Sequence, residues 1–293
     1  MKPALTYAEQ LALLLKRNLI IPDEDAALHH LRDNNYYRIS AYARPFQIAP
    51  GAGGNDDFQP GTTLEMVLDL ATFDSELRRL VLAGLESIEV ATRAVLAYAI
   101  ATKFGATAYG DHSFYQSKAA NAVLDAVDSD LDRASEAYLI HHEAKHGRQA
   151  YPPVWVTVEA LSFGSLSKVM SGAKSDHYAN QVAGRWNLNG EFFKSLIHHF
   201  AYVRNVCAHH NRLWNRQLSV KMKDFLTPTH PLYPKMAGSS TESMYRTLVF
   251  LNFLLQKLDP KSDFEARLFG LVNRDDFRAK GLGFPPGHAL ESF

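Results

Sequence analysis

The sequence has little of several features that would assign a protein to a class. It has one cysteine, Cys207, in 293 residues, which excludes a disulfide framework or a cysteine-based zinc site within the chain. Its longest uninterrupted apolar run, residues 94–101, is far too short to span a bilayer. Lysine plus arginine and aspartate plus glutamate both number 31, so the net charge is zero. The global charge therefore indicates neither a nucleic acid nor a membrane partner.

No alternation of strand and helix patterns and no internal repeat is visible. Lys2 is followed by proline instead of a long apolar run, so we expect no signal peptide and a cytoplasmic protein without a membrane partner. Apolar residues make up 46% of the chain, which is enough for a sizeable core. Apolar residues recur at spacings of three and four from about Leu64 to Thr102, which predicts one long helix. Thr6 and Glu9 have the spacing of a capping box at the start of a helix. A further helical pattern runs through residues 116–147, and together with similar patterns elsewhere it predicts an all-α fold.

A loop rich in glycine, proline and aspartate at residues 49–61 is the best candidate boundary. It divides an N-terminal helical extension, residues 1–48, from a helical domain at residues 62–275. The remainder, residues 276–293, is predicted to be a loop-like C-terminal tail. The stretch 154–172 is ambiguous, because it begins with β-branched residues and ends with a helical pattern.

Charge is distributed unevenly within this neutral chain. Residues 185–223 hold seven lysines and arginines against a single acid, Glu191. Residues 121–143 are the reverse, with six acids against Arg133 alone. Such a local excess of positive charge favours a local anionic ligand for the segment 185–223.

Two motifs outside the basic segment can each be interpreted as a functional site or as an ordinary structural feature. The string His142-Glu143-Ala144-Lys145-His146 matches the H-E-x-x-H pattern of zinc hydrolases. Gly147 follows at once and the flanking residues are charged or small, so a solvated helix end is favoured over zinc chemistry. The second motif comprises Glu86, Glu89 and Arg93 on the long predicted helix. Glu89 and Arg93 are spaced as a surface ion pair, with support of a polar site as the alternative.

The most informative stretch is the helix predicted to begin after Asn189-Gly190. An apolar stripe along it is accompanied by polar residues at spacings of three and four, namely Ser195, His198, Tyr202, Asn205 and His209. Arg204 lies five residues before His209, which corresponds to about 140° of rotation and about 7.5 Å of rise. The two side chains could converge if the long guanidinium bends, or across a two-fold axis between two copies. The alternative without a functional site is that these polar groups form hydrogen bonds with one another and cap the helix end.

The string "RNVCAHHNRLWNR" at residues 204–216 resembles the signature of Abi-like proteins, the AbiD/AbiF abortive-infection family of bacteria. Arg204-Asn205 followed by His209 also resembles the R-x(4–6)-H motif of HEPN domains. Further blocks resemble the family in the expected order, namely "NNYYRISAYARPF" (34–46), "FDSELRRLVLAGLESIEVATRAVLAYAI" (73–100), "WVTVEALSFGSLSKVM" (155–170) and "GFPPG" (283–287). The motif alone is weak, but the ordered set of blocks is specific.

The resemblance implies an all-α HEPN-type helical bundle with an N-terminal helical extension, assembled as a homodimer. It implies metal-independent RNA cleavage without a cofactor, used as a toxin-like defence against phage and restrained by an antitoxin RNA or protein. Carried over by position, Arg204 and His209 are the catalytic pair. The supporting residues are Asn205, His210 and Tyr202, and His210 also satisfies the loose spacing of the motif.

These residue types suit the chemistry of RNA cleavage. RNA supplies its own nucleophile, the 2′-hydroxyl. An imidazole can take up that proton or protonate the leaving oxygen, and a guanidinium can stabilise the charged phosphorane. The candidates for attracting phosphates are Arg212, Arg216, Lys221 and Lys223. The alternative is a non-catalytic HEPN module that binds RNA or protein in the same cleft. Trp214 is expected to anchor the helix end in the core, with base stacking as the alternative.

Overall fold

The computed structural model describes residues 3–48, 56–147, 151–174, 177–223, 230–236, 238–273 and 275–286. In these ranges the chain forms helices joined by short connections, with three isolated β-bridges and no strand. The all-α prediction is therefore confirmed. None of the helices in the described ranges combines the length and apolar character needed to cross a bilayer.

The chain divides into two compact units, residues 1–76 and 77–293. The dividing point lies inside α4, Leu64–Phe104, the long helix that the sequence predicts. The sequence instead placed a boundary in the loop 49–61, of which residues 49–55 lie outside the described residues. In the described part of that loop, Phe58 is buried and donates its backbone N–H to the carbonyl of Arg17, so this part packs within the first unit.

The first unit contains short helices before the beginning of α4, namely α1 (Tyr7–Lys16), α2 (Glu24–Asp33), α3 (Tyr36–Ala43) and the 3-10 helix η1 (Arg44–Phe46). Thr6 and Glu9 form a reciprocal capping box at the start of α1, as the sequence predicts. The hydroxyl of the buried Tyr42 donates to the carboxylate of Asp74 at 2.6 Å, which ties α3 to the first part of α4.

The second unit contains the rest of α4 and the helices that follow. They are η2 (Ala108–Gly110), η3 (His112–Phe114), α5 (Ala120–Arg133), α6 (Ala137–His146), α7 (Val154–Ala160), α8 (Phe163–Gly172), α9 (His177–Gly184), α10 (Gly190–Ala208), α11 (Tyr233–Met236), α12 (Met244–Leu258), α13 (Phe264–Val272) and α14 (Asp276–Leu282). Gly84 of α4 lies close to Leu251 and Leu255 of α12, because a Cβ at this position would sit 3.1–3.2 Å from their side chains.

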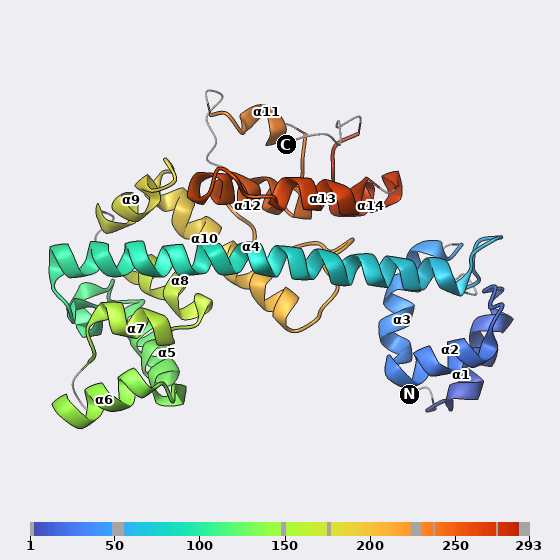
Figure 1. Ribbon diagram of the computed structural model, residues 1–293, viewed down its shortest axis with the longest axis horizontal. Coiled ribbons are helices and arrows are strands. Elements are labelled where there is room, and N and C mark those ends of the chain that lie inside the picture. The colour runs from blue at the N-terminus through green and yellow to red at the C-terminus, as the bar shows by residue number, and fades with distance from the viewer. Residues whose placement is uncertain are drawn as a thin grey trace. The chain divides into compact units, whose positions relative to one another are not determined.

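Helix α10 is the central element of this unit (Figure 1). Asn189 caps its first turn by accepting from the backbone N–H groups of Glu191 and Phe192, which confirms the predicted start. The helix packs against α8 and α9, and Phe192 meets Phe250 of α12 at a ring distance of 5.0 Å. Figure 1 shows α10 crossing α4. The apolar stripe of α10 is thereby buried on several sides, and only its polar residues and its C-terminal end reach the surface.

Three details differ from the sequence prediction. The pattern at residues 116–147 forms two helices, α5 and α6, because α5 ends where Ala134 adopts an extended conformation. The ambiguous stretch 154–172 is also two helices, with Ser162 capping α8. The predicted loop-like tail instead contains α14, which buries Arg278, Ala279 and Leu282. The residues beyond 286 lie outside the described residues.

Candidate functional site at the end of helix α10

The C-terminal end of α10 is closed by hydrogen bonds that place the two histidines differently. His209 is the C-cap residue, and its backbone N–H donates to the carbonyl of Asn205 at 3.0 Å. The N–H groups of His210 and Asn211 donate to Cys207 and Val206 at 3.0 Å each, which is the Schellman pattern. His210 occupies the left-handed position of that motif, with φ 55°. Both imidazoles are exposed, but only His209 continues the helix.

Arg204 lies one turn before this end, held between α10 and α4. Its Nε is 3.7 Å from the Glu89 carboxylate, and its Nη1 donates to the side-chain oxygen of Asn205 at 3.3 Å. The Arg204 side chain is 36% exposed, so it is partly fixed and still accessible. The side chain of Asn205 accepts from Arg204, and its backbone carbonyl accepts from the backbone N–H of His209.

Glu89 makes a second ion pair behind Arg204. Arg93 Nη2 contacts its other carboxylate oxygen at 2.6 Å and also donates to the carbonyl of Leu161 at 3.0 Å. Arg93 Nη1 lies 3.5 Å from Glu159 of α7. Burial raises the pKa of Glu89, although Arg93 and Arg204 act in the opposite direction. The sequence left open whether Glu89 and Arg93 form a plain ion pair or support a polar site, and the structure connects them to Arg204.

Tyr202 brings the segment after the helix back onto α10. Its hydroxyl accepts from Nε of Arg216 at 3.3 Å, and Arg216 Nη1 donates to the carbonyl of Arg212 at 3.3 Å. Burial acts to raise the pKa of Tyr202, but hydrogen bonds with Ser219 and Arg216 and the charge of Arg216 outweigh it, so the pKa is lowered. Arg216 thus lies on the same side of α10 as Tyr202, and it contacts the backbone of Arg212.

The two candidate lysines lie farther along the same segment. Lys221 pairs with Glu242, and Lys223 lies 3.9 Å from Glu191. The backbone N–H of Lys223 donates to the Ser195 hydroxyl at 2.9 Å. Both lysine side chains are more than half exposed, and exposed ion pairs are weak. Their charges remain accessible to a phosphate, but each is partly neutralised by an acid.

Trp214 anchors the segment between the helix end and these lysines. It is buried, and its indole N–H donates to the carbonyl of Arg278 at 3.0 Å. Gly281 of α14 lies directly against the indole, because a Cβ there would be 2.0 Å from Trp214 Cε2. The predicted anchoring role is confirmed, and base stacking by this residue is excluded.

Histidines often act in catalysis, but the structure places His199 in the core. It is buried, with Nδ1 2.6 Å from the carbonyl of Val220 and Nε2 2.8 Å from the hydroxyl of Thr247. A carbonyl only accepts, so Nδ1 carries the proton and Nε2 accepts from Thr247. Burial lowers the pKa of His199 to about 4. The sequence signal for this role is the position of His199 beside the apolar residues Leu196 and Phe200 of the helix.

The histidines of the H-E-x-x-H string lie on α6, whose last residue is His146. The rings of His142 and His146 are 4.7 Å apart. Gly147 ends the helix with φ 87°, as the sequence predicts. Among the described residues, no group of three or more histidine, cysteine, aspartate or glutamate side chains is close enough to hold a metal ion. The pair therefore has no third ligand in that part of the chain.

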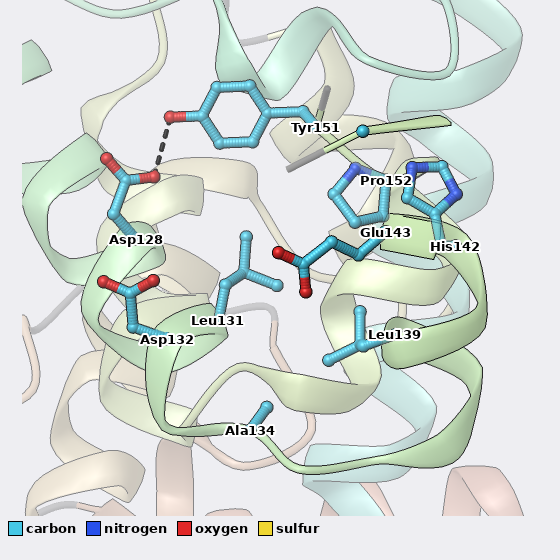
Figure 2. Close-up of a pocket in the computed structure, with 10 residues that line it drawn as sticks. Asp128, Leu131, Asp132, Ala134, Leu139, His142, Glu143, Tyr151 and Pro152 are labelled. Carbon is cyan, nitrogen blue, oxygen red and sulfur yellow. Dashed lines mark hydrogen bonds between the residues drawn. The ribbon is translucent and has the colours of Figure 1, made fainter. Parts of the chain in front are cut away.

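A cavity of about 500 Å³ lies beside His142, between α5 and α6. Figure 2 shows the carboxylates of Asp128, Asp132 and Glu143 around it, with Leu131 between the two aspartates and Glu143. Tyr151 donates its hydroxyl to Asp128 at 2.7 Å. Three carboxylates make this cavity unfavourable for a phosphate group.

The fold and the α10 end define an all-α protein with an accessible arginine and histidine at the close of one central helix. A family model described as Abi-like protein matches residues 29–215, which include this helix end. That span is more than half of the chain, so the chain belongs to the family of Abi-like proteins. No curated protein and no solved structure matches the chain.

Proposed function

We propose that this chain is a metal-independent endoribonuclease of the abortive-infection type, with a site formed by Arg204 and His209 of two copies. The arrangement of Arg204 carries the proposal: a guanidinium held by the buried Glu89, partly exposed, one turn before an exposed histidine. The family of the chain and its HEPN-like motif support the same reaction class.

Each residue has a distinct role in the proposed reaction. His209 removes the proton from the 2′-hydroxyl or protonates the leaving 5′-oxygen, and His209 of a second copy carries out the other of these two proton transfers. Arg204 stabilises the negative charge that develops on the phosphorane. The attack of the 2′-oxygen on phosphorus breaks the bond to the 5′-oxygen and leaves a 2′,3′-cyclic phosphate and a 5′-hydroxyl.

The surrounding residues position these groups. Glu89 and Asn205 hold Arg204, and the Schellman motif fixes His209 at the helix end. Arg212, Arg216, Lys221 and Lys223 attract the RNA backbone, with an affinity that falls as salt concentration rises. In its host the activity would need a restraint, for which an antitoxin RNA or protein is the proposed partner.

The test is cleavage of single-stranded RNA in EDTA by the wild-type protein, with analysis of the new ends. We expect cyclic phosphate ends, and a loss of cleavage in Arg204→Ala with RNA binding weakened but retained. Glu89→Gln should lower the rate roughly tenfold, because the guanidinium is then less firmly held, and should also lower the melting temperature, because the partly buried Arg93 loses its charged partner. Wild-type protein that binds RNA and leaves it intact would instead identify a non-catalytic binding module.

A further inference from the structure

A second feature of the surface lies along α4, next to the arginine network. Tyr98 and Trp155 are large aromatic residues that are 64% and 54% exposed. Both line a groove of about 310 Å³, and the buried Ala97 and Val158 form its floor. Tyr98 comes from α4 and Trp155 from α7, so the two rings reach the groove from different helices.

The groove is connected to the Arg204 site through ion pairs. Glu159 lines the groove and lies 3.5 Å from Arg93, which in turn contacts Glu89, the partner of Arg204. From Glu89 to Ala97, α4 rises about 12 Å and turns by about 80°. A strand of RNA whose phosphate contacts Arg204 would therefore place a base in the groove within a few nucleotides.

The chemistry of the groove favours a planar, uncharged group. Glu159 is the one charged residue among those that line the groove, and Arg93 lies 3.5 Å from it, so the rim has no cation of its own to attract a phosphate. Two exposed aromatic rings above small apolar side chains offer faces for stacking, which every nucleobase can use. Glu159 can also accept a hydrogen bond from a base amino or imino group.

The size of the groove argues against a protein partner. A stable protein interface buries about 800 Å² on each partner, whereas an aromatic side chain buries about 150–250 Å² when fully covered. Tyr98 and Trp155 are already partly covered, so together they supply well under half of that area. That area is enough for a single stacked base.

We propose that this groove binds a nucleobase of single-stranded RNA by stacking on Trp155 and Tyr98. The inference rests on the proposed RNA binding at the end of α10, and it assigns to the substrate a base contact outside the cleavage site. Single-stranded RNA is the class of substrate that fits, because the bases of a duplex are not free to enter a groove.

The tryptophans of the chain provide a direct measurement. There are three; Trp186 and Trp214 are 0% and 1% exposed, so Trp155 is the one a ligand can reach. The probe is a short single-stranded oligonucleotide with 2′-O-methyl groups throughout, which lacks the nucleophile for the proposed reaction. We expect it to quench the tryptophan emission, and an oligomer of the same length with abasic sugars to quench far less.

Variants separate stacking from general attraction. Trp155→Ala should weaken binding about tenfold to a hundredfold, the usual effect of removing one stacked base, whereas Trp155→Phe should keep most of the affinity. Tyr37→Ala removes an aromatic residue that is 82% exposed in the first unit and serves as the matched control, with unchanged binding expected.

Several outcomes would overturn the inference. They are no quenching by the oligonucleotide, equal quenching by the abasic oligomer, or wild-type affinity in Trp155→Ala. A change in Trp155 emission on dilution without RNA would assign the groove to a second copy. Cleavage of unmodified RNA is followed in parallel: quenching without cleavage would overturn the nuclease proposal and leave the base site, and cleavage without quenching would do the reverse.

Discussion

Two helices of this protein end in histidines, and their surroundings are opposite. Near the end of α6, His142 lines a cavity with three carboxylates, and the ring of His146 lies 4.7 Å from that of His142. At the end of α10, His209 follows Arg204, and the basic segment runs back along the helix. The same residue type thus has an acidic environment at one site and a cationic one at the other, and only the second suits a polyanion. Neighbouring charge, more than the presence of histidines, distinguishes the two sites.

The largest expected effect separates the two helix ends directly. His209→Ala should lower RNA cleavage by roughly 10²–10⁴-fold, the usual contribution of a general acid or base. His146→Ala, which also removes an exposed imidazole at a helix end, should cleave as the wild type does. Both are compared in the same EDTA assay at equal protein concentration. Equal losses in the two variants would contradict the distinction drawn between the sites.

The next effect concerns a histidine of α10 that does not reach the surface. Burial holds the pKa of His199 at about 4, below its value of about 6.5 in the unfolded chain. The stability it contributes is complete above pH 6.5 and is lost as pH falls towards 4, by roughly 3 kcal/mol in all. Denaturant unfolding at pH 7 and pH 4.5 should show a smaller acid loss in His199→Gln than in the wild type.

His198 is the matched control for this pH effect, since it is the exposed neighbour of His199 on the same helix. His198→Gln should keep the acid sensitivity of the wild type. A wild-type pH dependence in His199→Gln would show that the buried imidazole does not produce the acid loss.

A third effect tests how the basic segment is anchored beside α10. Gly281→Ala places a methyl group against the buried Trp214, and such overpacking usually costs about 1–3 kcal/mol. Gly270→Ala, in α13, meets no atom within 4 Å and should stabilise the helix by up to about 1 kcal/mol. Melting temperatures of the two variants should therefore move in opposite directions, and a shift in the same direction would contradict the close packing at Trp214.

The smallest effect decides between the two adjacent histidines. His210 has φ 55°, a conformation that costs most residues about 1–2 kcal/mol and glycine almost nothing. Glycine also loses more freedom on folding, so His210→Gly should change the free energy of unfolding by less than about 1 kcal/mol and leave cleavage intact. If instead this variant folds normally and loses cleavage, the catalytic imidazole is His210.

Much of the fold follows from local patterns that the sequence displays. The spacing of apolar residues predicts α4, and Thr6 and Asn189 mark the starts of α1 and α10 through side-chain caps. Helix α14 was missed because its seven residues lie in a stretch rich in glycine and proline, and burial of Arg278 and Leu282 stabilises it. The split of residues 116–147 was missed because α5 and α6 have continuous helical patterns across a break of only a few residues.

The candidate site was predictable in its residue types and not in its contacts. Arg204, Asn205 and His209 lie within one short stretch, so the sequence alone places them at one helix end. The partner of Arg204 is Glu89, more than a hundred residues earlier, and the sequence offered it only as a neighbour of Arg93. Pairing between distant helices depends on how they pack, which local spacing does not encode.

The amino-acid sequence by itself determined that this protein is all-α and that an arginine and a histidine close one of its helices, because both depend on residues a few positions apart. Tertiary structure alone decided which charges surround them. It brought the buried Glu89 against Arg204, anchored the basic segment against α14 through Trp214, and placed acids around the cavity that His142 lines. Coulomb interactions act through space, so only the packed chain settles them.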